Sequence, residues 1–391
     1  MSRPSILQIV HGFIEGGSER QMIQMVTLLH ESGDYDVHVA SLSTGGVLRP
    51  LIERLQVPII DLPLTSFYDA NMLRQTRQFV SYLKQHNIGI VHSHDFYSNI
   101  FGMTGATLAR VRGRIASKRE TTGTRTSAQR TVERNAFRLA HAVVANAAAV
   151  KEHLISEGVR PNKIAVIYNG IDLSRFQQNG MPEDALVRLN LQSIRGRPVI
   201  TMVANFEYKV KDYPMLLRTA QRVTREVPEA VFVIAGEGIL REETERLAEK
   251  MGLRESCLFT GRCASVPDLL AASDICVLSS QAEGFSNSIL EYMAAGRAVV
   301  ATNVGGAAEA IVEGETGHLV NAGDDAAMAA RLVELLKDPE RRAAMGHNGR
   351  RVVEERFSLQ SRLANTSALY QKTLSGSSAA KDRETEKRTS P

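Results

Sequence analysis

The stretch ICVLSSQAEGFSNSILE, residues 275–291, decides the fold class that we predict for this chain. Ile275 to Leu278 is a short apolar, partly β-branched run that predicts a buried strand, whereas Ile289 and Tyr292 follow at the spacing of a helix. Gly284 allows a sharp turn between the two segments. A strand, a tight loop and a helix in succession form the repeating unit of a parallel sheet that is covered by helices.

Two carboxylates flank the start of this expected helix. Glu283 falls on the loop and Glu291 within the helix, while the backbone N–H groups from Phe285 to Ser288 favour an anion at the helix start. Carboxylates do not bind phosphate, so hydroxyl groups are their natural partners. A ligand with phosphates flanked by hydroxyl-rich groups, such as a nucleotide-sugar, fits this arrangement. An ordinary capped helix with solvated glutamates fits the spacing equally well.

The size and composition predict two globular domains that are surrounded by water. The chain has 391 residues, which exceeds the roughly 250–300 residues at which one hydrophobic core stops growing. It is 43% hydrophobic and 23% charged, and no apolar run approaches the ~18 residues of a membrane helix. The first apolar run, Ile6 to Val10, predicts a strand rather than a secretion signal, so we expect a cytoplasmic protein. The three cysteines have no paired spacing and predict neither disulfides nor zinc.

Short apolar segments alternate with amphipathic ones throughout, which predicts an α/β fold with parallel sheets. We expect two series of strands. The first comprises residues 6–10, 37–42, 59–62, 88–92, 114–117, 142–145 and 164–167; the second comprises residues 199–204, 231–235, 257–260, 275–278, 298–301 and 317–320.

The domain limits follow from these two series. We expect a first domain over residues 1–176, a polar linker over 177–197 and a second domain over 198–355. A further helical stretch lies within residues 356–374. The remainder, 375–391, has no apolar content with which to offset the entropy of ordering, so it is expected to be disordered.

The motif around Glu283 resembles the signature of a known enzyme family. A glutamate, seven residues and a second glutamate, with Gly-Phe-Ser-Asn inside, is similar to the signature of the retaining glycosyltransferases of family 4. This resemblance implies the GT-B fold, two Rossmann-like doubly wound domains facing a cleft, with a final helix that crosses back to the first domain. It also implies that Glu283 contacts the donor sugar and that Glu291 holds the ribose. The diphosphate would be held by the amides of Gly284, Phe285, Ser286, Asn287 and Ser288.

Further donor contacts are implied at other strand ends. The pair Gly16 and Gly17 resembles the family's first loop, which reaches toward the diphosphate. After the strand at 199–204, relatives carry an Arg and a Lys six residues apart, and here these positions hold Asn205 and Lys211. Lys211 keeps the role of neutralising the diphosphate, and Lys209 or Arg119 is expected to supply the second charge. The remaining candidates follow the next two strands and fit ordinary turns equally well: Gly236, Gly261 and Arg262.

The acceptor side is expected at His92, His94 and Asp95, because the family often has His-x-His at this strand end. The spacing of the two histidines also suits a metal, so a metal-dependent hydrolase is a rival interpretation. Relatives place another histidine after the next strand, where this chain has Arg119. A guanidinium is no general base, so Arg119 is expected to hold a phosphate or a sugar hydroxyl, unless it is a surface arginine.

Basic residues gather in one segment of the first domain. Nine lie between Arg110 and Arg138, against two glutamates. Arg130, Arg134 and Arg138 repeat every four residues along one helix face, which suits an anionic membrane surface or a lipid-linked diphosphate. A solvated helix face fits equally well. Phe137 is the only aromatic residue of this segment, so we expect no nucleic-acid binding.

The sequence therefore predicts a retaining hexosyltransferase. The donor would be a nucleoside-diphosphate sugar, with UDP or GDP favoured over ADP, and the acceptor a saccharide or lipid-linked saccharide of bacterial cell-surface polysaccharide synthesis. We expect no cofactor. The resemblance also implies no divalent metal, since no Asp-x-Asp site precedes a strand end in a suitable place. The alternatives are an epimerase or hydrolase of the same architecture, or a non-catalytic nucleotide-sugar-binding protein.

Overall fold

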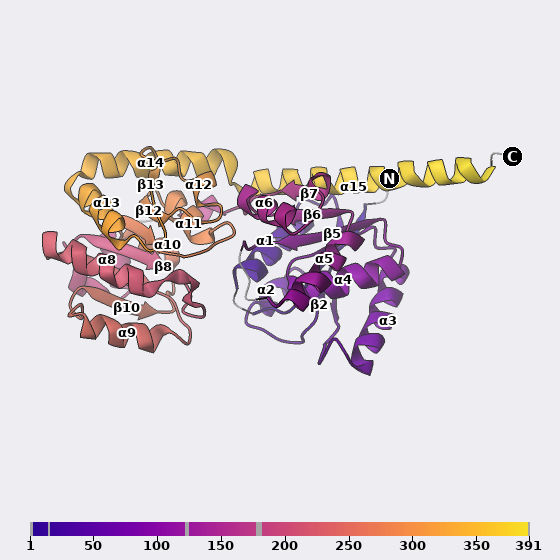
Figure 1. The fold of residues 1–391 in the computed structure, drawn as a ribbon, viewed down its shortest axis with the longest axis horizontal. Helices are drawn as coiled ribbons and strands as arrows, with labels where there is room; N and C mark the ends of the chain where they lie inside the picture. The colour runs from indigo at the N-terminus through magenta and orange to yellow at the C-terminus, as the bar shows by residue number, and fades with distance from the viewer. Residues whose placement is uncertain (1–2, 15, 122–124, 177–181, 390–391) are drawn as a thin grey trace. The chain divides into compact units, whose positions relative to one another are not determined.

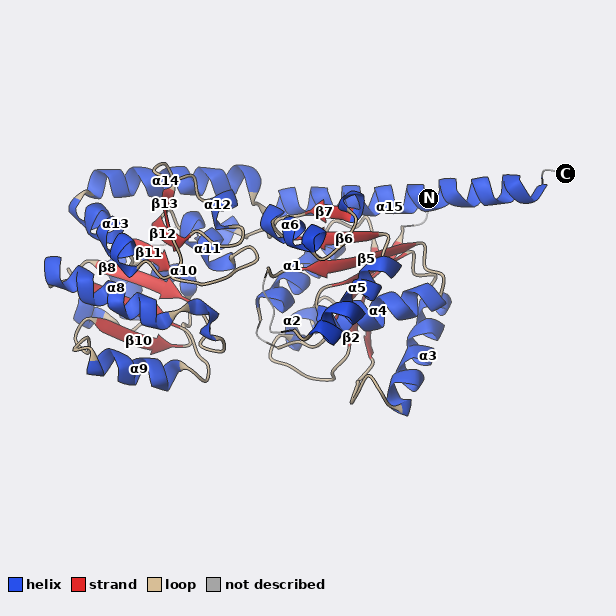
Figure 2. Cartoon of the chain, viewed as in Figure 1, coloured by secondary structure: helices blue, strands red, loops and turns tan. Residues whose placement is uncertain are grey.

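The chain forms two compact α/β units in a computed structural model (Figure 1). The structure describes residues 3–14, 16–121, 125–176 and 182–389. The first unit comprises Met1–Gly170 together with Leu359–Pro391, and the second comprises Ile171–Ser358. In both units, helices lie on the two faces of a central sheet, as Figure 2 shows. This is the layered arrangement that the alternating pattern predicts.

The first unit is built on a parallel sheet of seven strands in the order β3-β2-β1-β4-β5-β6-β7. The order reverses between β1 and β4, which pair directly in the register Ile6 to Ile90. All seven expected strands form, with ends that shift by no more than two residues. They are β1 (Ser5–Val10), β2 (Asp36–Ser41), β3 (Ile59–Asp61), β4 (Ile90–Ser93), β5 (Gly113–Lys118), β6 (Ala142–Ala145) and β7 (Ile164–Val166).

The helices of the first unit connect successive strands. Side chains of α1 and the apolar faces of β1, β2 and β4 share one core with Tyr370, a residue from the far end of the sequence. The helices are α1 (Gly17–Glu31), α2 (Arg49–Glu53), α3 (Ala70–Gln85), α4 (Phe96–Leu108), α5 (Ser127–Leu139), α6 (Ala148–Ser156) and the 3-10 turn η1 (Pro161–Lys163).

The second unit repeats this design with six parallel strands in the order β10-β9-β8-β11-β12-β13. The order again reverses at the first strand, between β8 and β11. The expected strands all form: β8 (Val199–Val203), β9 (Val231–Ala235), β10 (Cys257–Gly261), β11 (Ile275–Leu278), β12 (Ala298–Thr302) and β13 (Gly317–Val320). In such sheets ligands bind beyond the carboxyl ends of the strands, at the point of reversal.

The helices of the second unit cover both faces of this sheet. Helix α8 shows why: its Met215, Leu216, Ala220 and Val223 fall on one buried face at helical spacing. The helices are α7 (Pro182–Arg188), α8 (Tyr213–Glu226), α9 (Arg241–Lys250), α10 (Val266–Ala271), α11 (Asn287–Ala294), α12 (Ala307–Ala310), α13 (Asp325–Lys337) and α14 (Pro339–Arg356), with 3-10 turns η2 (Leu173–Phe176), η3 (Gln192–Ile194) and η4 (Lys209–Lys211).

The segment expected as a linker, 177–197, is part of the second unit. Residues 177–181 lie outside the described part of the chain, but the rest forms α7 and η3. Leu186, Leu191 and Ile194 are buried in one core with strands β8 and β9. The prediction was wrong because a segment without a strand of its own buries Leu186 in α7, Leu191 after it and Ile194 in η3 against those two strands. The units divide at residues 170 and 171 rather than after 176.

The last helix, α15 (Leu359–Thr389), returns to the first unit, as the family resemblance implies. Buried Arg362 donates from Nη2 to the backbone oxygen of Gln21 at 2.9 Å, which ties α15 to α1. The helix continues to Thr389, whereas the sequence predicts disorder from Ser375. Residues 379–388 are mostly Ala, Lys, Arg and Glu, whose high helix propensity prolongs a helix without an apolar face. Among the described residues, no helix is both long and apolar enough to cross a membrane.

Candidate active site

An ion pair joins two loops at the reversal point of the second sheet. Lys211 lies in η4, after β8, and Glu283 lies on the loop after β11. The Nζ atom of Lys211 donates to Oε1 of Glu283 at 2.6 Å, and the hydroxyl of Ser280 donates to the same oxygen at 2.7 Å. The side chains of the pair are 16% and 14% exposed. The pair is therefore rigidly held but still reachable from solvent.

The backbone around Asp212 positions Lys211. Asp212 adopts a left-handed conformation, with φ of 49°, and its Oδ1 accepts from the backbone N–H of Met215 to begin α8. Its Oδ2 accepts from the side-chain amide of Gln281 at 3.0 Å. The hydroxyl of Ser279 donates to the carbonyl of Lys211 at 2.8 Å. These bonds fasten the loop after β8 to the end of β11, and so fix the lysine against the glutamate.

Helix α11 begins directly beside Glu283. Its N-cap is Ser286, whose Oγ accepts from the backbone N–H of Ile289, and the N–H groups of Asn287 and Ser288 open the first turn. The hydroxyl of Ser288 donates to the carbonyl of Val203 at 2.8 Å, which ties the helix start to β8. The positive end of the helix dipole therefore lies at this end of α11, next to the loop that carries Glu283. Glu283 lies on the loop and Glu291 within α11, as the sequence predicts.

The turn at Gly305 and Gly306 packs against the loop that carries Glu283. Gly305 has φ of +54°, and a Cβ atom there would lie 2.1 Å from the carbonyl oxygen of Glu283. The N–H of Gly306 donates to the carbonyl of Gly284 at 2.7 Å. Only glycine permits so close an approach, so this glycine pair has a structural role.

The other donor candidates of the second unit lie around the loops after β8, β9 and β10. A Cβ atom on Gly236 would lie 1.9 Å from the carbonyl of Ala204, so this glycine lets two loops meet at the strand ends. Gly261 ends β10, and the backbone N–H of Arg262 donates to Glu237 at 3.2 Å. The side chains of Asn205, Lys209 and Arg262 are exposed.

In the first unit, the two histidines lie in a buried polar network. The ring nitrogens of His92 lie 2.8 Å from the hydroxyl of Tyr370 and 2.9 Å from that of Ser117. Nε2 of His94 lies 2.6 Å from the side-chain oxygen of Gln8. Burial, with help from nearby Arg119 and Arg362, lowers the pKa of His92 to about 3. This ring is therefore neutral at physiological pH.

Arg119 contacts this network from the end of β5. Its Nη2 lies 3.1 Å from Nδ1 of His94, and its Nη1 donates to Asn169 at 3.1 Å. Because a guanidinium only donates, Nδ1 of His94 must accept, and Nε2 then carries the proton that it donates to Gln8. A metal ion would have to displace a cation from His94, so the geometry disfavours the metal-hydrolase interpretation. Burial lowers the pKa of Arg119 to about 10. Arg119 is no ordinary surface arginine.

Two carboxylates lie near Arg119 at the carboxyl ends of β1 and β4. Asp95 caps α4, and its Oδ2 accepts from the backbone N–H of His11 at 2.7 Å, which joins the two loops. Buried Glu19 lies in the first turn of α1, next to Gly16 and Gly17, the latter being the first residue of that helix. Burial raises the pKa of Glu19, the charge of Asp95 adds to this effect, and Arg119 opposes it.

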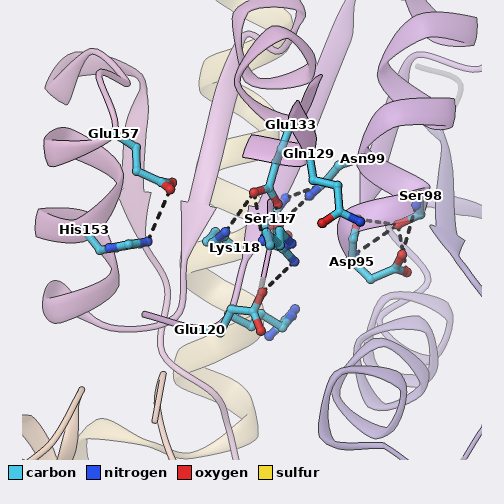
Figure 3. Close-up of polar contacts among 12 residues, drawn as sticks. Asp95, Ser98, Asn99, Ser117, Lys118, Glu120, Gln129, Glu133, His153 and Glu157 are labelled. Carbon is cyan, nitrogen blue, oxygen red and sulfur yellow. Dashed lines mark hydrogen bonds and ion pairs between the residues drawn. The ribbon is translucent and has the colours of Figure 1, made fainter. Parts of the chain in front are cut away.

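Part of the basic segment is neutralised within the unit, as Figure 3 shows. Lys118 is buried and donates to Oε2 of buried Glu133 at 2.8 Å. Arg125 donates to both oxygens of Glu133, at 2.9 and 2.8 Å, and also pairs with Glu120. Lys118 and Arg125 are therefore neutralised by carboxylates of the same unit and do not add to an anion-facing surface. Arg130 and Arg138 remain exposed on α5.

The sequence does not reveal several residues of these networks. Ser280, Gln8, Glu19 and Tyr370 all contact predicted site residues or lie beside them. Gln8 gives the clearest signal, because it is a polar residue in the middle of an apolar run. Tyr370 gives none, since its partner Gln8 is 362 positions away.

Two family models match the two halves of the chain. "Glycosyltransferase Family 4" matches residues 15–175, and "Glycosyl transferases group 1" matches residues 188–352. Between them they cover strands β2 to β13 and the loops that carry Lys211, Glu283 and Arg119.

Two relatives and one solved structure illustrate the similarity. The N-acetyl-alpha-D-glucosaminyl L-malate synthase of Bacillus anthracis is 30% identical, over 57% of this chain and 58% of the relative. The lipopolysaccharide core biosynthesis mannosyltransferase LpcC of Rhizobium leguminosarum bv. viciae is 29% identical, over 54% of this chain and 60% of the relative. The chain thus spans less than two thirds of either relative in these matches.

The fold is that of Anabaena Alr3699/HepE, solved in complex with UDP-glucose. The TM-score is 0.81 at 21% identity, over 95% of this chain and 99% of that one. The predicted α/β GT-B fold is confirmed. With its two Rossmann-like units, its two matching family models and its related enzymes, the chain belongs to family 4 of the glycosyltransferases.

Proposed function

We propose that this chain is a retaining glycosyltransferase. It moves a sugar from a nucleoside-diphosphate sugar to a saccharide or lipid-linked saccharide in bacterial cell-surface polysaccharide synthesis. The observation that carries the proposal is the Lys211–Glu283 pair at the reversal point of the second sheet, beside the start of α11. A cation, a carboxylate and a helix N-terminus together suit a ligand that has a diphosphate next to a sugar. The relative LpcC, named for lipopolysaccharide core synthesis, supports the proposed pathway.

We propose the following chemistry for this arrangement. In transfer, the bond between the sugar's anomeric carbon and the diphosphate breaks, and a bond to an acceptor hydroxyl forms on the same face. The acceptor proton passes to a phosphate oxygen. Negative charge then grows on the diphosphate, where the ammonium of Lys211 and the dipole of α11 stabilise it. Glu283 accepts from sugar hydroxyls and Glu291 from the ribose. No step requires a metal.

The first unit is proposed to hold the acceptor. Asp95, His94 and Arg119 follow neighbouring strands β4 and β5 at their carboxyl ends. Arg119 has one buried nitrogen, Nε, that lacks a hydrogen-bond partner among the described residues. Such a guanidinium suits a phosphate or a sugar hydroxyl of a substrate. His94 is held by Gln8 and Arg119, so we assign it a positioning role.

A panel of UDP-, GDP- and ADP-sugars tests the donor class. We expect a UDP- or GDP-sugar to raise the melting temperature, because a ligand that binds only the folded state stabilises it. The UDP-glucose complex of the structural neighbour HepE favours UDP. Incubation of the stabilising donor with candidate saccharides, in EDTA, should then yield a product with retained anomeric configuration. No stabilisation by any donor would refute the proposal, and release of free sugar alone would identify a hydrolase instead.

Contact with an anionic membrane surface is a second proposal. It is supported by Arg130 and Arg138, which are both exposed on α5. Each basic residue near an anionic surface contributes about 1 kcal/mol. Sedimentation with phosphatidylglycerol vesicles should therefore weaken in the Arg130→Gln/Arg138→Gln variant. Equal sedimentation of variant and wild type would refute it.

A further inference from the structure

A small pocket opens at the end of the first sheet where strands β6 and β7 begin. It has a volume of about 290 Å³ and is lined by residues at the end of α5 and in the turn between α6 and β7: Arg134, Phe137, Arg138, Gly158, Val159, Arg160 and Lys163. Arg119, His94 and Asp95 lie beyond the carboxyl ends of their strands, which is the opposite end of the sheet. The pocket is therefore separate from the candidate active site.

The pocket is strongly cationic. Arg134, Arg138, Arg160 and Lys163 all line it, and none of the described lining residues is acidic. Two carboxylates lie next to lining residues in the sequence, but both have other partners. Glu133 is held by Lys118 and Arg125, and Glu157 lies 3.6 Å from Nε2 of His153 (Figure 3). Neither carboxylate is therefore committed to the pocket cations.

Arg134 and Lys163 have no acidic partner among the described lining residues of the pocket. The buried Nε atom of Arg134 has no hydrogen-bond partner among the residues that the structure describes. Nζ of Lys163 donates to the carbonyls of Arg138 and Ala140, at 3.0 and 2.7 Å, which fixes it at the end of α5. Burial and the charges of Arg160 and Arg114 lower the pKa of Lys163. Clustered like charges of this kind are relieved by an anion that accepts from several of them at once.

We propose that this pocket binds a phosphate group. Guanidinium groups match the tetrahedral oxygens of a phosphate through paired N–H donors, and three arginines converge here. The volume lies at the lower end of the roughly 300–1,000 Å³ that is usual for small-molecule sites, which suits a compact anionic group. The phosphate belongs either to a soluble compound or to a lipid headgroup. The inference does not depend on the proposed transferase activity.

Calorimetric titration with inorganic pyrophosphate at low salt tests the site. All arms carry Lys211→Ala, which removes the cation expected to bind diphosphate in the second unit. We expect the additional pair Arg138→Gln/Arg160→Gln to weaken binding roughly a hundredfold or more, because two charge-assisted bonds are lost and each is worth at least about tenfold. Both side chains are exposed, so the fold should persist, and an unchanged melting curve checks this.

Arg130→Gln is the matched control, because Arg130 lies on the same helix but does not line the pocket. It should leave pyrophosphate affinity unchanged. The proposal is refuted if the parent protein binds no pyrophosphate, if the double variant binds as well as its parent, or if Arg130→Gln weakens binding equally.

Vesicles distinguish the two sources of phosphate. If phosphatidylglycerol vesicles displace pyrophosphate and phosphatidylcholine vesicles do not, the pocket takes a headgroup. If neither displaces it, the pocket takes a soluble phosphate. Both results support a phosphate site.

Discussion

At the scale of single residues, Glu283 accepts two short hydrogen bonds, from Lys211 and Ser280. Glu283→Gln keeps the shape of the side chain but removes its charge. We expect the turnover number to fall about 10²-fold or more, the effect of losing one electrostatic contact to a transition state. The melting temperature should change little, because the residue lies on a solvent-accessible loop. Glu226→Gln is the control, since it breaks an exposed Lys–Glu pair elsewhere in the second unit. Turnover equal to wild type would remove Glu283 from the mechanism.

Gly305 tests how the Glu283 loop is supported. In Gly305→Ala the new methyl group meets the carbonyl of Glu283 and the backbone keeps an unfavourable positive φ. Gly314→Ala is matched to it, because Gly314 has φ of +78° and open space around its Cβ position. We expect both variants to lose roughly 1–2 kcal/mol from the positive φ. Gly305→Ala alone should also lose transferase activity. Equal activity of the two variants would show that the loop tolerates the displacement.

At the scale of elements, α15 is joined to β1 and β4 through one hydroxyl. Tyr370→Phe leaves buried Gln8 and His92 each without a partner that they have in the wild type. We expect a loss of about 1–3 kcal/mol in the free energy of unfolding. Tyr35→Phe is the control, because the ring of Tyr35 packs edge-on against Tyr370 in the same core. Denaturant titration that gives the same stability for both variants would show that the hydroxyl bonds contribute nothing.

The same network predicts a pH dependence of stability. The pKa of His92 is about 3 in the folded protein, against 6.5 when unperturbed, so between these values only the unfolded chain binds this proton. The free energy of unfolding should therefore fall as the pH falls below 6.5. The slope from this histidine is about 1.4 kcal/mol per pH unit. His92→Gln should show a shallower slope between pH 6.5 and 5. An identical slope in denaturant titrations would contradict the burial of a neutral ring.

The thirteen strands of the described residues were predictable, because most of them are short apolar runs between turns. Segment 182–197 was not, since Leu186, Leu191 and Ile194 acquire meaning only once β8 and β9 supply the surface against which they pack. The motif around Glu283 placed its two glutamates correctly on loop and helix. The pairing of Glu283 with Lys211 requires that two loops meet although these residues are 72 positions apart. The order of the strands in the sheet decides this meeting, and the local sequence does not. For the same reason, the sequence alone did not separate buried Lys118 from exposed Arg130.

At the scale of the whole molecule, two truncations test the contributions of the two parts of α15: residues 375–391, and the part from Leu359 that packs on the first unit. Removal of 375–391 leaves Arg362 and Tyr370 in place, and we expect the melting temperature to stay within about 2 °C of wild type. Removal from Leu359 onward also deletes Tyr370 and three partly buried leucines from the hydrophobic core of the first unit: Leu363, Leu369 and Leu374. This longer truncation should unfold the first unit, while the second unit keeps a separate calorimetric transition. A single unchanged transition would contradict the division into these units.

The path of the chain has a consequence for biosynthesis. The second unit is continuous from Ile171 to Ser358, whereas the first is interrupted by it and resumes at Leu359. On the ribosome, the second unit therefore emerges complete while the nascent first unit still lacks the segment that supplies Arg362 and Tyr370. Until that segment is translated, Gln8 and His92 lack a partner that burial requires. The second unit can fold first, and the unit that begins the sequence is the last to be completed.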